Sequence, residues 1–468
     1  LESELLKLTN LGAFKEQDLV EAYADKMGWA KLSQEEISEI ERLASIVEES
    51  PEGIKRAQAV EDLLGYEAKI KGIPLMDVVT SIWYANVLSG FTTQLVNFIA
   101  NATQLLFSYG ETAIRNPRTG AFMARGIIDG VNRGILEAGS SLKTGYNPIR
   151  GRVEIPSTLE LKTFKGGKYN PANYLKYVRR LMVASDVIMF EAQKEMRAYQ
   201  WARMLAANEN KLDPTVSIKQ RALDILHAND STIPDAKVKA AEEAQTEIDA
   251  VNAENISSSE KAKKIRNIKT NEKRRAFELV QESRGSEIMD ESNAYASWNT
   301  FNHPASGLLG AVAKRVNQLI ETNGVTKIFR FVVPFTNVIA NVANMGINYT
   351  PWGYIRAARQ GSVFGIPKAE WDSMSKMQQD QYRVELVTKA TVGLAMSAAV
   401  LMLTLKGDDD DEPLLEITAN ATGKYKKNEG LKEDGWQPYS FRVYNKKTKE
   451  YGDWISYQYS PLLVMFSL

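Results

Sequence analysis

Two residue types that carry much of protein chemistry are nearly missing from this chain. Its 468 residues include no cysteine and only two histidines, His227 and His303. Disulfide bonds and thiolate catalysis are therefore excluded, and most zinc sites lack their usual ligands. Net charge is missing too, because 58 basic residues balance 58 acidic ones. No global electrostatic field then attracts the chain to nucleic acid or to an anionic membrane.

Motifs of the common enzyme classes are absent as well. The sequence contains no GxxxxGK[ST], no HExxH and no GxSxG, and no GxGxxG follows a predicted strand. The acidic run Asp408–Glu412 lacks the spaced ligands and central glycine of a calcium loop, so we interpret it as a solvated turn. We expect no catalytic centre, no cofactor and no metal in this segment. The chain begins at Leu1 and ends in the apolar run Ser460–Leu468, which indicates a piece of a longer polypeptide whose other parts could hold an enzyme.

What the chain has instead is three long stretches without a charged side chain. Val78–Gly110 runs for 33 residues, and Phe331–Ile355 and Ala390–Leu405 follow it, in a protein that is 25% charged. A bilayer crossing takes about 20 apolar residues, but the recurrent asparagines of the first two stretches are costly in lipid. For the first stretch we therefore expect contact with protein or a polar lumen before contact with lipid.

The third stretch, Ala390–Leu405, is the best candidate for a membrane helix. As a helix it would span about 24 Å, which is short for a full crossing, although Lys389 and Lys406 at its ends could extend it by snorkelling. A buried bundle helix is an equal alternative, and Gly393 and Ser397 would suit tight packing in either setting. The side chains expected to meet membrane or neighbouring subunits are Trp83, Phe91, Phe98, Phe331, Phe335, Trp352, Leu394 and Leu401.

A stripe of glycines marks the helix predicted from about Thr119 to Leu142. Gly126, Gly130 and Gly134 recur every four residues. Glycine costs about 1 kcal/mol relative to alanine inside a helix, so three in register indicate that a second helix approaches closely and offsets the cost. Chance glycines in a weak helix are the alternative.

Local signals place several helix boundaries. Ser33 and Glu36 have the spacing of a capping box, which begins a helix. Asn116-Pro117 precedes the glycine-striped helix and marks its start. A long helix is predicted from about Ala172 to Ala207, with its apolar residues near one face.

Residues 208–285 are polar, and their charges are segregated. Acidic residues cluster in Glu242–Asp249, and a basic run follows from Lys261 to Arg275. Such a run is usually a solvated helix face or a linker, and contact with DNA or with an acidic neighbouring helix is the alternative. The candidate DNA or anion contacts are Lys261, Lys263, Lys264, Arg266, Arg274 and Arg275.

The pattern changes near the end of the chain, where Tyr439–Tyr444 and Tyr451–Tyr457 alternate apolar and polar residues and predict a β-hairpin. We expect a mainly α, elongated multi-helix assembly with this small C-terminal β-hairpin. The expected parts are soluble helices at 1–73, an apolar segment with the glycine-striped and long helices at 74–207, a charged helical or linker region at 208–285, apolar segments with Pro and Gly breaks and a short hydrophobic helix at 286–406, and an acidic turn with the hairpin at 407–468.

Four stretches carry a resemblance when they are taken together in chain order. They are Asn86–Gly90 with Asn97 and Asn101; Arg179–Leu181 with Ala184, Asp186 and Phe190; Phe331–Gly353 with Pro334-Phe335 and Thr350-Pro351-Trp352-Gly353; and Gly435, Trp436, Pro438, Tyr439 and Ser440 with Trp454–Tyr457. This set resembles the large internal virion (ejection) proteins of tailed bacteriophages, which are related to the large polyvalent proteins of phages and mobile elements. The Gly-Trp-x-Pro-Tyr-Ser stretch is the most specific of the four. Thr336-Asn337 lacks the proline of that family's pattern, and residues 208–285 match no part of it.

The resemblance implies a protein that is packaged in the capsid, ejected with the genome, and assembled into or along a conduit for DNA across the host cell envelope. Its implied partners are other copies of itself and other virion proteins at the portal or core, with genomic DNA and the host membrane as further candidates. Its implied location is the capsid interior or portal region, and then the host envelope. The alternatives are a non-inserting inner-core or cargo scaffold, or a non-catalytic segment of a larger polyvalent enzyme.

Overall fold

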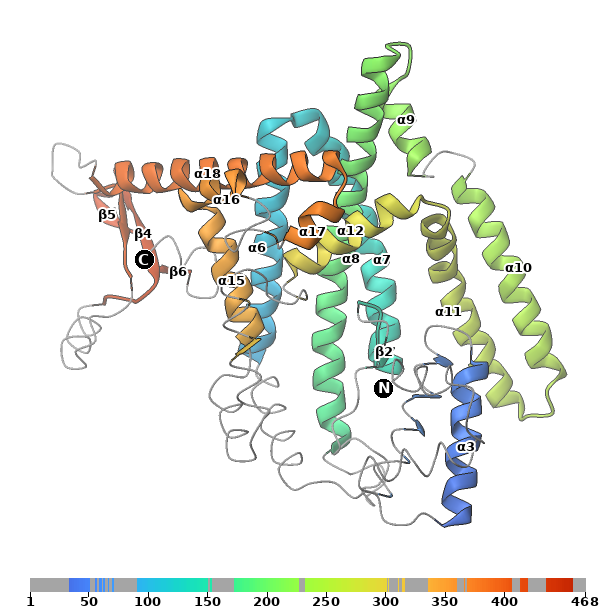
Figure 1. Cartoon of the computed structure of the whole chain (residues 1–468). Helices are drawn as coiled ribbons and strands as arrows, with labels where there is room; N and C mark the ends of the chain where they lie inside the picture. The colour runs from blue at the N-terminus through green and yellow to red at the C-terminus, as the bar shows by residue number, and fades with distance from the viewer. Residues whose placement is uncertain are drawn as a thin grey trace. The chain divides into compact units, whose positions relative to one another are not determined.

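The protein is mainly helical, as predicted, with a small antiparallel sheet near its C-terminus (Figure 1). A computed structural model describes residues 33–50, isolated positions between 55 and 70, 91–149, 152–153, 172–226, 232–300, 302, 310, 314–315, 336–359, 366, 368–405, 413–419 and 435–457. The chain divides into two compact units, residues 1–90 with 139–184 and residues 91–138 with 185–468.

In the first unit, local chemistry sets the helix ends. Helix α3 (Gln34–Glu49) begins at the predicted capping box, in which Ser33 N donates to Glu36 Oε2 at 2.8 Å and Glu36 N donates to Ser33 Oγ at 3.3 Å. Further along the chain, Gly145 adopts φ +78° just after a helix, and the Arg180 guanidinium donates to the carbonyl of Lys143 at 2.8 Å. A two-stranded antiparallel pair follows, β1 (Tyr146–Asn147) with β2 (Arg152–Val153).

Helices α6 (Phe91–Arg115) and α7 (Pro117–Thr144) meet at the predicted break. Pro117 takes the first helical position, where its missing N–H costs nothing. The Asn116 side chain accepts a hydrogen bond from Thr119 N at 3.1 Å, which caps the new helix.

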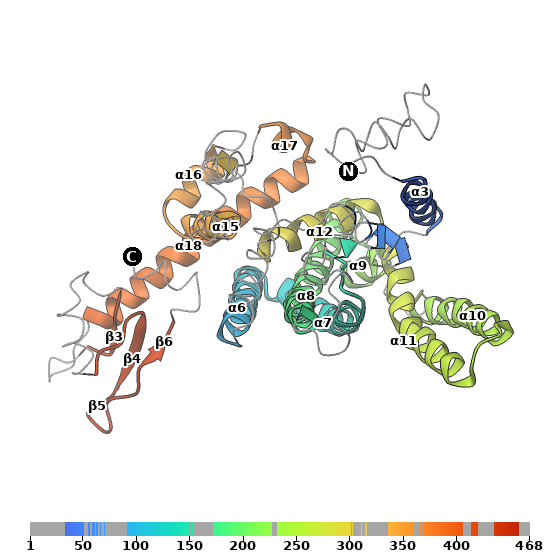
Figure 2. The same cartoon turned by 90° about the horizontal axis from the view of Figure 1, so that it is seen from below.

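Helix α8 (Ala172–Leu212) lies among α6, α7 and α12 (Ser286–Asn299) (Figures 1 and 2). Every residue from Met189 to Ala202 is buried. The prediction of a single apolar face is therefore wrong for this part of the helix. Helix α8 contacts α7 through the glycine stripe. A methyl group added to Gly126 would lie 2.8 Å from the Glu195 carbonyl oxygen, and one added to Gly134 would lie 2.7 Å from Ile188 Cα, so only glycine allows this approach. A methyl group on Gly130 would overlap the Glu191 carbonyl.

The charged region forms helices rather than a linker. After α9 (Ile218–Ile225), α10 (Thr232–Ala253) packs along α11 (Ser258–Glu282) as a helical hairpin, visible in both views (Figures 1 and 2). Small buried side chains such as Ala240 and Ala244 let the two helices approach. Helix α12 (Ser286–Asn299) follows.

The last helices are α15 (Thr336–Asn348), α16 (Trp352–Ala358), α17 (Lys368–Ser373) and α18 (Lys376–Leu405). Pro351 turns the chain between α15 and α16, as the predicted break requires. The expectation of a short hydrophobic helix is wrong, because Ala390–Leu405 continues a charged segment in one helix of 30 residues. A helix of that length spans about 45 Å.

The predicted C-terminal hairpin is present. Strand β4 (Ser440–Asn445) pairs with β5 (Glu450–Tyr451) and with β6 (Ile455–Ser456). Lys449 takes a left-handed φ of 57° in the turn, and Tyr444 lies opposite Tyr451 with ring centroids 5.2 Å apart. A further strand, β3 (Leu415–Ile417), pairs antiparallel with β4 and was not predicted.

Candidate functional site

Helix α18 has two chemically different halves. From Lys376 to Lys389 it carries charges of both signs, and from Ala390 to Leu405 it carries none. Within the described part of the chain it is the one helix whose length and composition suit a membrane crossing. A core helix of a soluble protein can have the same composition, but such a helix would be mostly buried, and 17% of the apolar window of α18 is buried.

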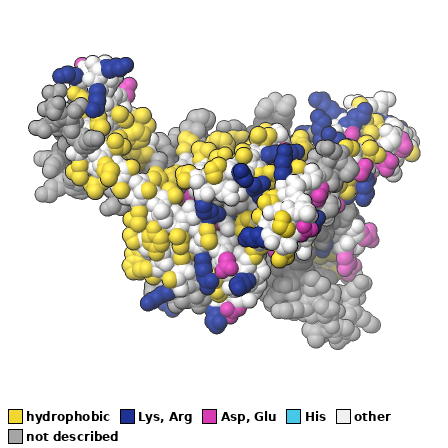
Figure 3. Space-filling view, turned by 90° about the horizontal axis from the view of Figure 1, so that it is seen from above, with side chains coloured by type: hydrophobic (Ala, Val, Ile, Leu, Met, Phe, Trp, Pro, Cys, Tyr) yellow, Lys and Arg dark blue, Asp and Glu magenta, His cyan; other side chains and the backbone are white. Residues whose placement is uncertain are grey.

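Large apolar side chains of the second half are exposed. Leu401 is 57% exposed, Met402 68% and Leu405 73%. Trp352 on α16 is also exposed, and hydrophobic side chains are spread across much of the surface on this side of the molecule (Figure 3). Contiguous apolar surface is costly in water unless a membrane or another protein covers it.

The start of this apolar half is braced by α15 and α16. A methyl group on Gly393 would overlap the Tyr349 carbonyl, and one on Gly353 would lie 2.9 Å from Ala390 Cβ. The Tyr354 hydroxyl lies 3.0 Å from the Thr391 hydroxyl. Gly393 therefore lies against the backbone at Tyr349, whereas Ser397 is exposed in the single chain and its role in packing stays a prediction. Beyond the first turn, the exposed side chains leave the apolar half open to other partners.

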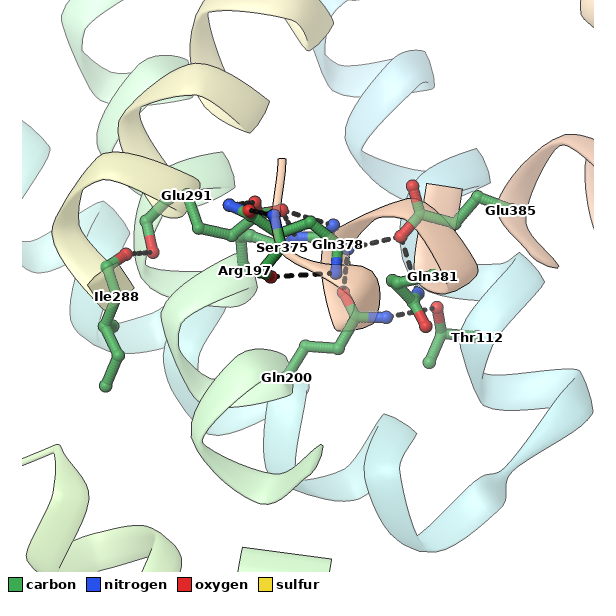
Figure 4. Close-up of polar contacts among 10 residues, drawn as sticks. Thr112, Arg197, Gln200, Ile288, Glu291, Ser375, Gln378, Gln381 and Glu385 are labelled. Carbon is green, nitrogen blue, oxygen red and sulfur yellow. Dashed lines mark hydrogen bonds and ion pairs between the residues drawn. The ribbon is translucent and has the colours of Figure 1, made fainter. Parts of the chain in front are cut away.

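The charged half of α18 is held by Arg197 of α8 (Figure 4). This arginine, whose side chain is 4% exposed, bonds Glu385 of α18 and lies 2.5 Å from Glu291 of α12. Its guanidinium also stacks over the Tyr295 ring at 4.4 Å. Burial alone would lower the pKa of Arg197, but Glu385 and Glu291 raise it above its usual value. One buried cation therefore joins three helices.

Glutamine side chains complete this cluster (Figure 4). Gln378 donates to Glu291 at 3.0 Å and Gln381 donates to Glu385 at 2.7 Å. Gln200 accepts from Arg197 at 2.9 Å. Each carboxylate thus has a neutral donor besides the arginine, which reduces the desolvation cost of burying it.

Other charges of α8 are buried and paired in the same manner. Glu195 receives both a 2.9 Å ion pair from Arg284 and a hydrogen bond from Gln281 of α11. Burial alone would raise the pKa of Glu195, but Arg284, together with Arg133 and Lys194, holds it below its usual value. Arg133 of α7 lies 2.9 Å from Glu191. Helix α8 is therefore anchored to its neighbours by ion pairs as well as by apolar contacts.

Another buried carboxyl lies on α6. Glu111 of α6 accepts a hydrogen bond from the Tyr349 hydroxyl at the end of α15. Burial raises the pKa of Glu111 to about 6, against the opposing effects of Lys389 and Tyr349. This contact joins α6 to the helices that brace α18.

The buried charges of α8 were missed at the level of sequence. Glu191, Lys194, Glu195 and Arg197 stand within one long helix, and solvent exposure is the default expectation for such residues. The available signal is the surroundings of these charges, since Glu191, Lys194 and Glu195 share one side of a helix that also carries apolar residues on every side. A helix with that pattern has no solvated face, so its charges must find partners.

The basic run lies on α11 and much of it is already paired. Lys264 bonds Glu254, and Arg275 lies 2.8 Å from Glu243 of α10. Arg274 lies 2.9 Å from Glu278. Lys261 donates to the Asn252 carbonyl at 2.6 Å, while Lys263 and Arg266 are exposed. The run therefore contacts an acidic neighbouring helix, which was one of the two alternatives to a solvated face.

The remaining candidate residues are scattered. Of the predicted membrane or assembly contacts, Phe98, Trp352, Leu394 and Leu401 are exposed. The side chain of Phe91 and the whole of Trp83, Phe331 and Phe335 lie outside the described residues, as do His227, His303 and Asp408–Glu412.

Hydrogen bonds of Ser440 hold the Gly-Trp-x-Pro-Tyr-Ser stretch at the start of the C-terminal hairpin. Ser440 N donates to Thr418 Oγ1 at 2.9 Å, and Ser440 Oγ donates to the Pro438 carbonyl at 3.0 Å. Gly435 and Tyr439 take positive φ angles of 83° and 48°. These contacts explain the residue types of the Gly-Trp-x-Pro-Tyr-Ser stretch as a structural turn leading into β4, with Trp436 half-buried beside it.

No group of three or more metal-ligating side chains occurs among the residues placed by the structure. Comparison with protein-family models, with curated proteins and with solved structures finds no match to this chain. The geometry of α18 and of its anchor is therefore the basis for a functional proposal.

Proposed function

We propose that this chain is an internal virion protein of a tailed bacteriophage, ejected with the genome, that helps to form or line a conduit for DNA across the host cell envelope. The observation that carries the proposal is the apolar half of α18, which is exposed while its charged half is fixed in the core. The four sequence stretches that resemble phage ejection proteins support the phage context.

The physical basis is the need to cover this apolar half in two settings. Ala390–Leu405 spans about 24 Å, or about four-fifths of the roughly 30 Å hydrocarbon thickness of a bilayer. Inside a capsid, neighbouring virion proteins would cover it. After ejection, a bilayer offers a better environment for the same side chains, and this difference in affinity drives the change of partner.

The proposal is tested with liposomes and the full chain. Ala398 is exposed near the middle of the apolar half, and a charge at the centre of a membrane helix costs about 2.5–3.5 kcal/mol. We expect Ala398→Lys to reduce liposome association and leakage by about a hundredfold. The matched control is Ala253→Lys, at an exposed position of α10, which should change neither.

Two results would contradict the membrane part of the proposal: wild-type protein that never associates with liposomes, or equal effects of the two lysine substitutions. The phage context has its own test. A tagged copy of the chain should be found inside purified particles and should be lost from them when the DNA is released. A tag that is absent from particles, or that stays in the empty capsid, would contradict it.

A non-inserting scaffold of the virion core is the second candidate. It is favoured by exposed apolar side chains on helices that do not suit a membrane crossing, namely Leu106 and Ile114 of α6 and Ile128 and Ile135 of α7. Such residues suit contact with other virion proteins. The scaffold is distinguished by assembly of the wild-type chain without any liposome association.

A further inference from the structure

We propose that the α10–α11 hairpin is a head-to-tail contact between copies of this chain, with the basic face of α11 from one copy meeting the acidic face of α10 from the next. This surface is separate from α18, and the inference does not depend on membrane insertion.

The charges of the hairpin are divided between its helices. Helix α10 carries five acidic and two basic residues, whereas α11 carries eight basic and four acidic ones. The ion pairs of Lys264 and Arg275 use cations that face α10. The charges that face away from the contact between the helices remain at the surface.

On α10 these outward charges form an acidic stripe, defined as Asp235, Glu242 and Asp249. The three residues are seven positions apart, nearly two full turns, so they share one face. All three are exposed, and the buried Ala240 and Ala244 lie on the opposite face against α11.

On α11 two exposed lysines four residues apart form a basic stripe, defined as Lys269 and Lys273. This stripe lies about 120–180° around the helix from Lys264 and Arg275, the cations whose ion pairs reach Glu254 and Glu243. The two stripes therefore lie on different sides of the hairpin. One two-fold contact between two copies cannot use both sides, so pairing acid with base repeats head to tail and gives a ring or a filament.

The register of the hairpin shows that the stripes match. Eleven residues separate Lys264 from Arg275, and eleven separate Glu243 from Glu254, so the two ion pairs define one constant register. In that register Lys269 lies level with Asp249, six residues from the Arg275–Glu243 pair on each helix.

The same register places two further contacts. Lys273 lies within three residues, about 4.5 Å along the axis, of the level of Glu242. Phe277 likewise lies within three residues of the level of Val238. These two apolar side chains are 38% and 58% exposed. Hairpins placed side by side in one orientation would thus bring together two ion pairs and one apolar pair.

This partner fits the hairpin better than DNA does. Packed helices have axes about 8–10 Å apart, so a phosphate backbone on the basic stripe would lie within about one Debye length of acidic α10 at 0.1 M salt. The chain as a whole is also electrically neutral. A second copy meets the same repulsion, but its carboxylates come level with Lys269 and Lys273 and its Val238 comes close to Phe277, a match that a phosphate backbone lacks.

The experiment is sedimentation velocity of the full chain over a range of concentrations at about 0.1 M and about 1 M salt. We expect concentration-dependent association at the lower salt. Reversal of either stripe, by Lys269→Glu with Lys273→Glu or by Glu242→Lys with Asp249→Lys, should weaken it about tenfold or more. Reversal of Lys211 and Lys219, exposed lysines on α8 and α9, is the matched control and should leave it unchanged.

The decisive variant combines both reversals, which restores opposite charges across the contact. We expect its association to return to within about threefold of the wild type, with unchanged circular dichroism in every variant. Wild-type protein that stays monomeric, or a combined variant no better than its parents, would overturn the proposal. So would a loss of binding to a DNA duplex in the Lys269→Glu, Lys273→Glu variant without any change in self-association.

Discussion

Replacing Arg197 by methionine should release the charged half of α18 from the core. The substitution keeps an unbranched side chain of similar length but removes the cation that bonds Glu385 and Glu291. Two carboxylates whose side chains are only 13% and 16% exposed then lose their cation, and each keeps a glutamine donor. Removing one partner of a buried ion pair costs about 3–5 kcal/mol.

We expect this cost to appear as local opening rather than as global unfolding alone. Amide hydrogen exchange measured on peptides from the first half of α18 and from α12 should accelerate by roughly two to four orders of magnitude. Peptides from the tip of the α10–α11 hairpin serve as the internal control, because they make no contact with Arg197 in the described structure.

A compensating variant tests the electrostatic reasoning. Combining Arg197→Met with Glu291→Gln and Glu385→Gln removes all three charges and leaves neutral side chains of similar size. We expect this combination to recover more than half of the lost protection, since an uncharged cluster is not penalised by unpaired charge. Acceleration of less than about tenfold in Arg197→Met, which corresponds to about 1.4 kcal/mol, or no recovery in the combined variant, would refute the reasoning.

Three further outcomes follow from single sites. The folded-state pKa of Glu111 is about 6 against an ordinary value of 4.5, so this carboxyl lowers the stability of the fold as pH rises from 4.5 to 6. Glu111→Gln should therefore exceed the wild type in unfolding free energy by about 2 kcal/mol above pH 6 and by little below pH 4.5. Urea melts that show a difference independent of pH would contradict this. Gly130→Ala should lower the unfolding free energy by about 1–3 kcal/mol, because the added methyl group overlaps α8. Gly139→Ala in the same helix has open space around it and should raise the unfolding free energy by about 0.5–1 kcal/mol. Equal thermal melts for the two variants would contradict the packing of the stripe. The side-chain amide of Gln193 is buried without a hydrogen-bond partner among the described residues, so Gln193→Met should raise the unfolding free energy by about 1 kcal/mol, and a loss of stability in the same melts would show that the amide is satisfied.

Local features of the fold could be predicted from the sequence because they depend on residues close together in the chain. The capping box at Ser33 needs only Glu36, and the break at Pro117 needs only the fixed geometry of proline. The β-hairpin around Asn445–Lys449 follows from period-two alternation on both sides of a turn. Strand β3 gave no comparable signal, because three residues are too few to show a period.

The glycine stripe marks the limit of such reasoning. Its spacing predicted a close neighbour for α7, and α8 is that neighbour. The identity of the neighbour could not be predicted, since no pattern in α7 specifies a partner some 60 residues further along the chain. For the same reason the cluster around Arg197 was missed, because its carboxylates come from positions 291 and 385.

The division of α18 was predicted in part. Its uncharged half was recognised from composition, but its continuity with the charged half was not. Composition alone ends the apolar run at Lys389, because a charged residue interrupts the run without ending the helix. In the structure the two halves form one continuous helix, so the Arg197 cluster fixes the position at which the apolar half begins.

The most direct test of the central claim is the depth of α18 in a bilayer. The chain has no cysteine, so Ala398→Cys provides a single attachment point for an environment-sensitive fluorophore, and Ala253→Cys on α10 provides the control. With liposomes present, the probe at position 398 should shift to shorter wavelength and be quenched by nitroxides on the lipid tails, while the probe at position 253 stays in water. A probe at position 398 that stays in water, or that is shielded only by other copies of the protein, would contradict the account.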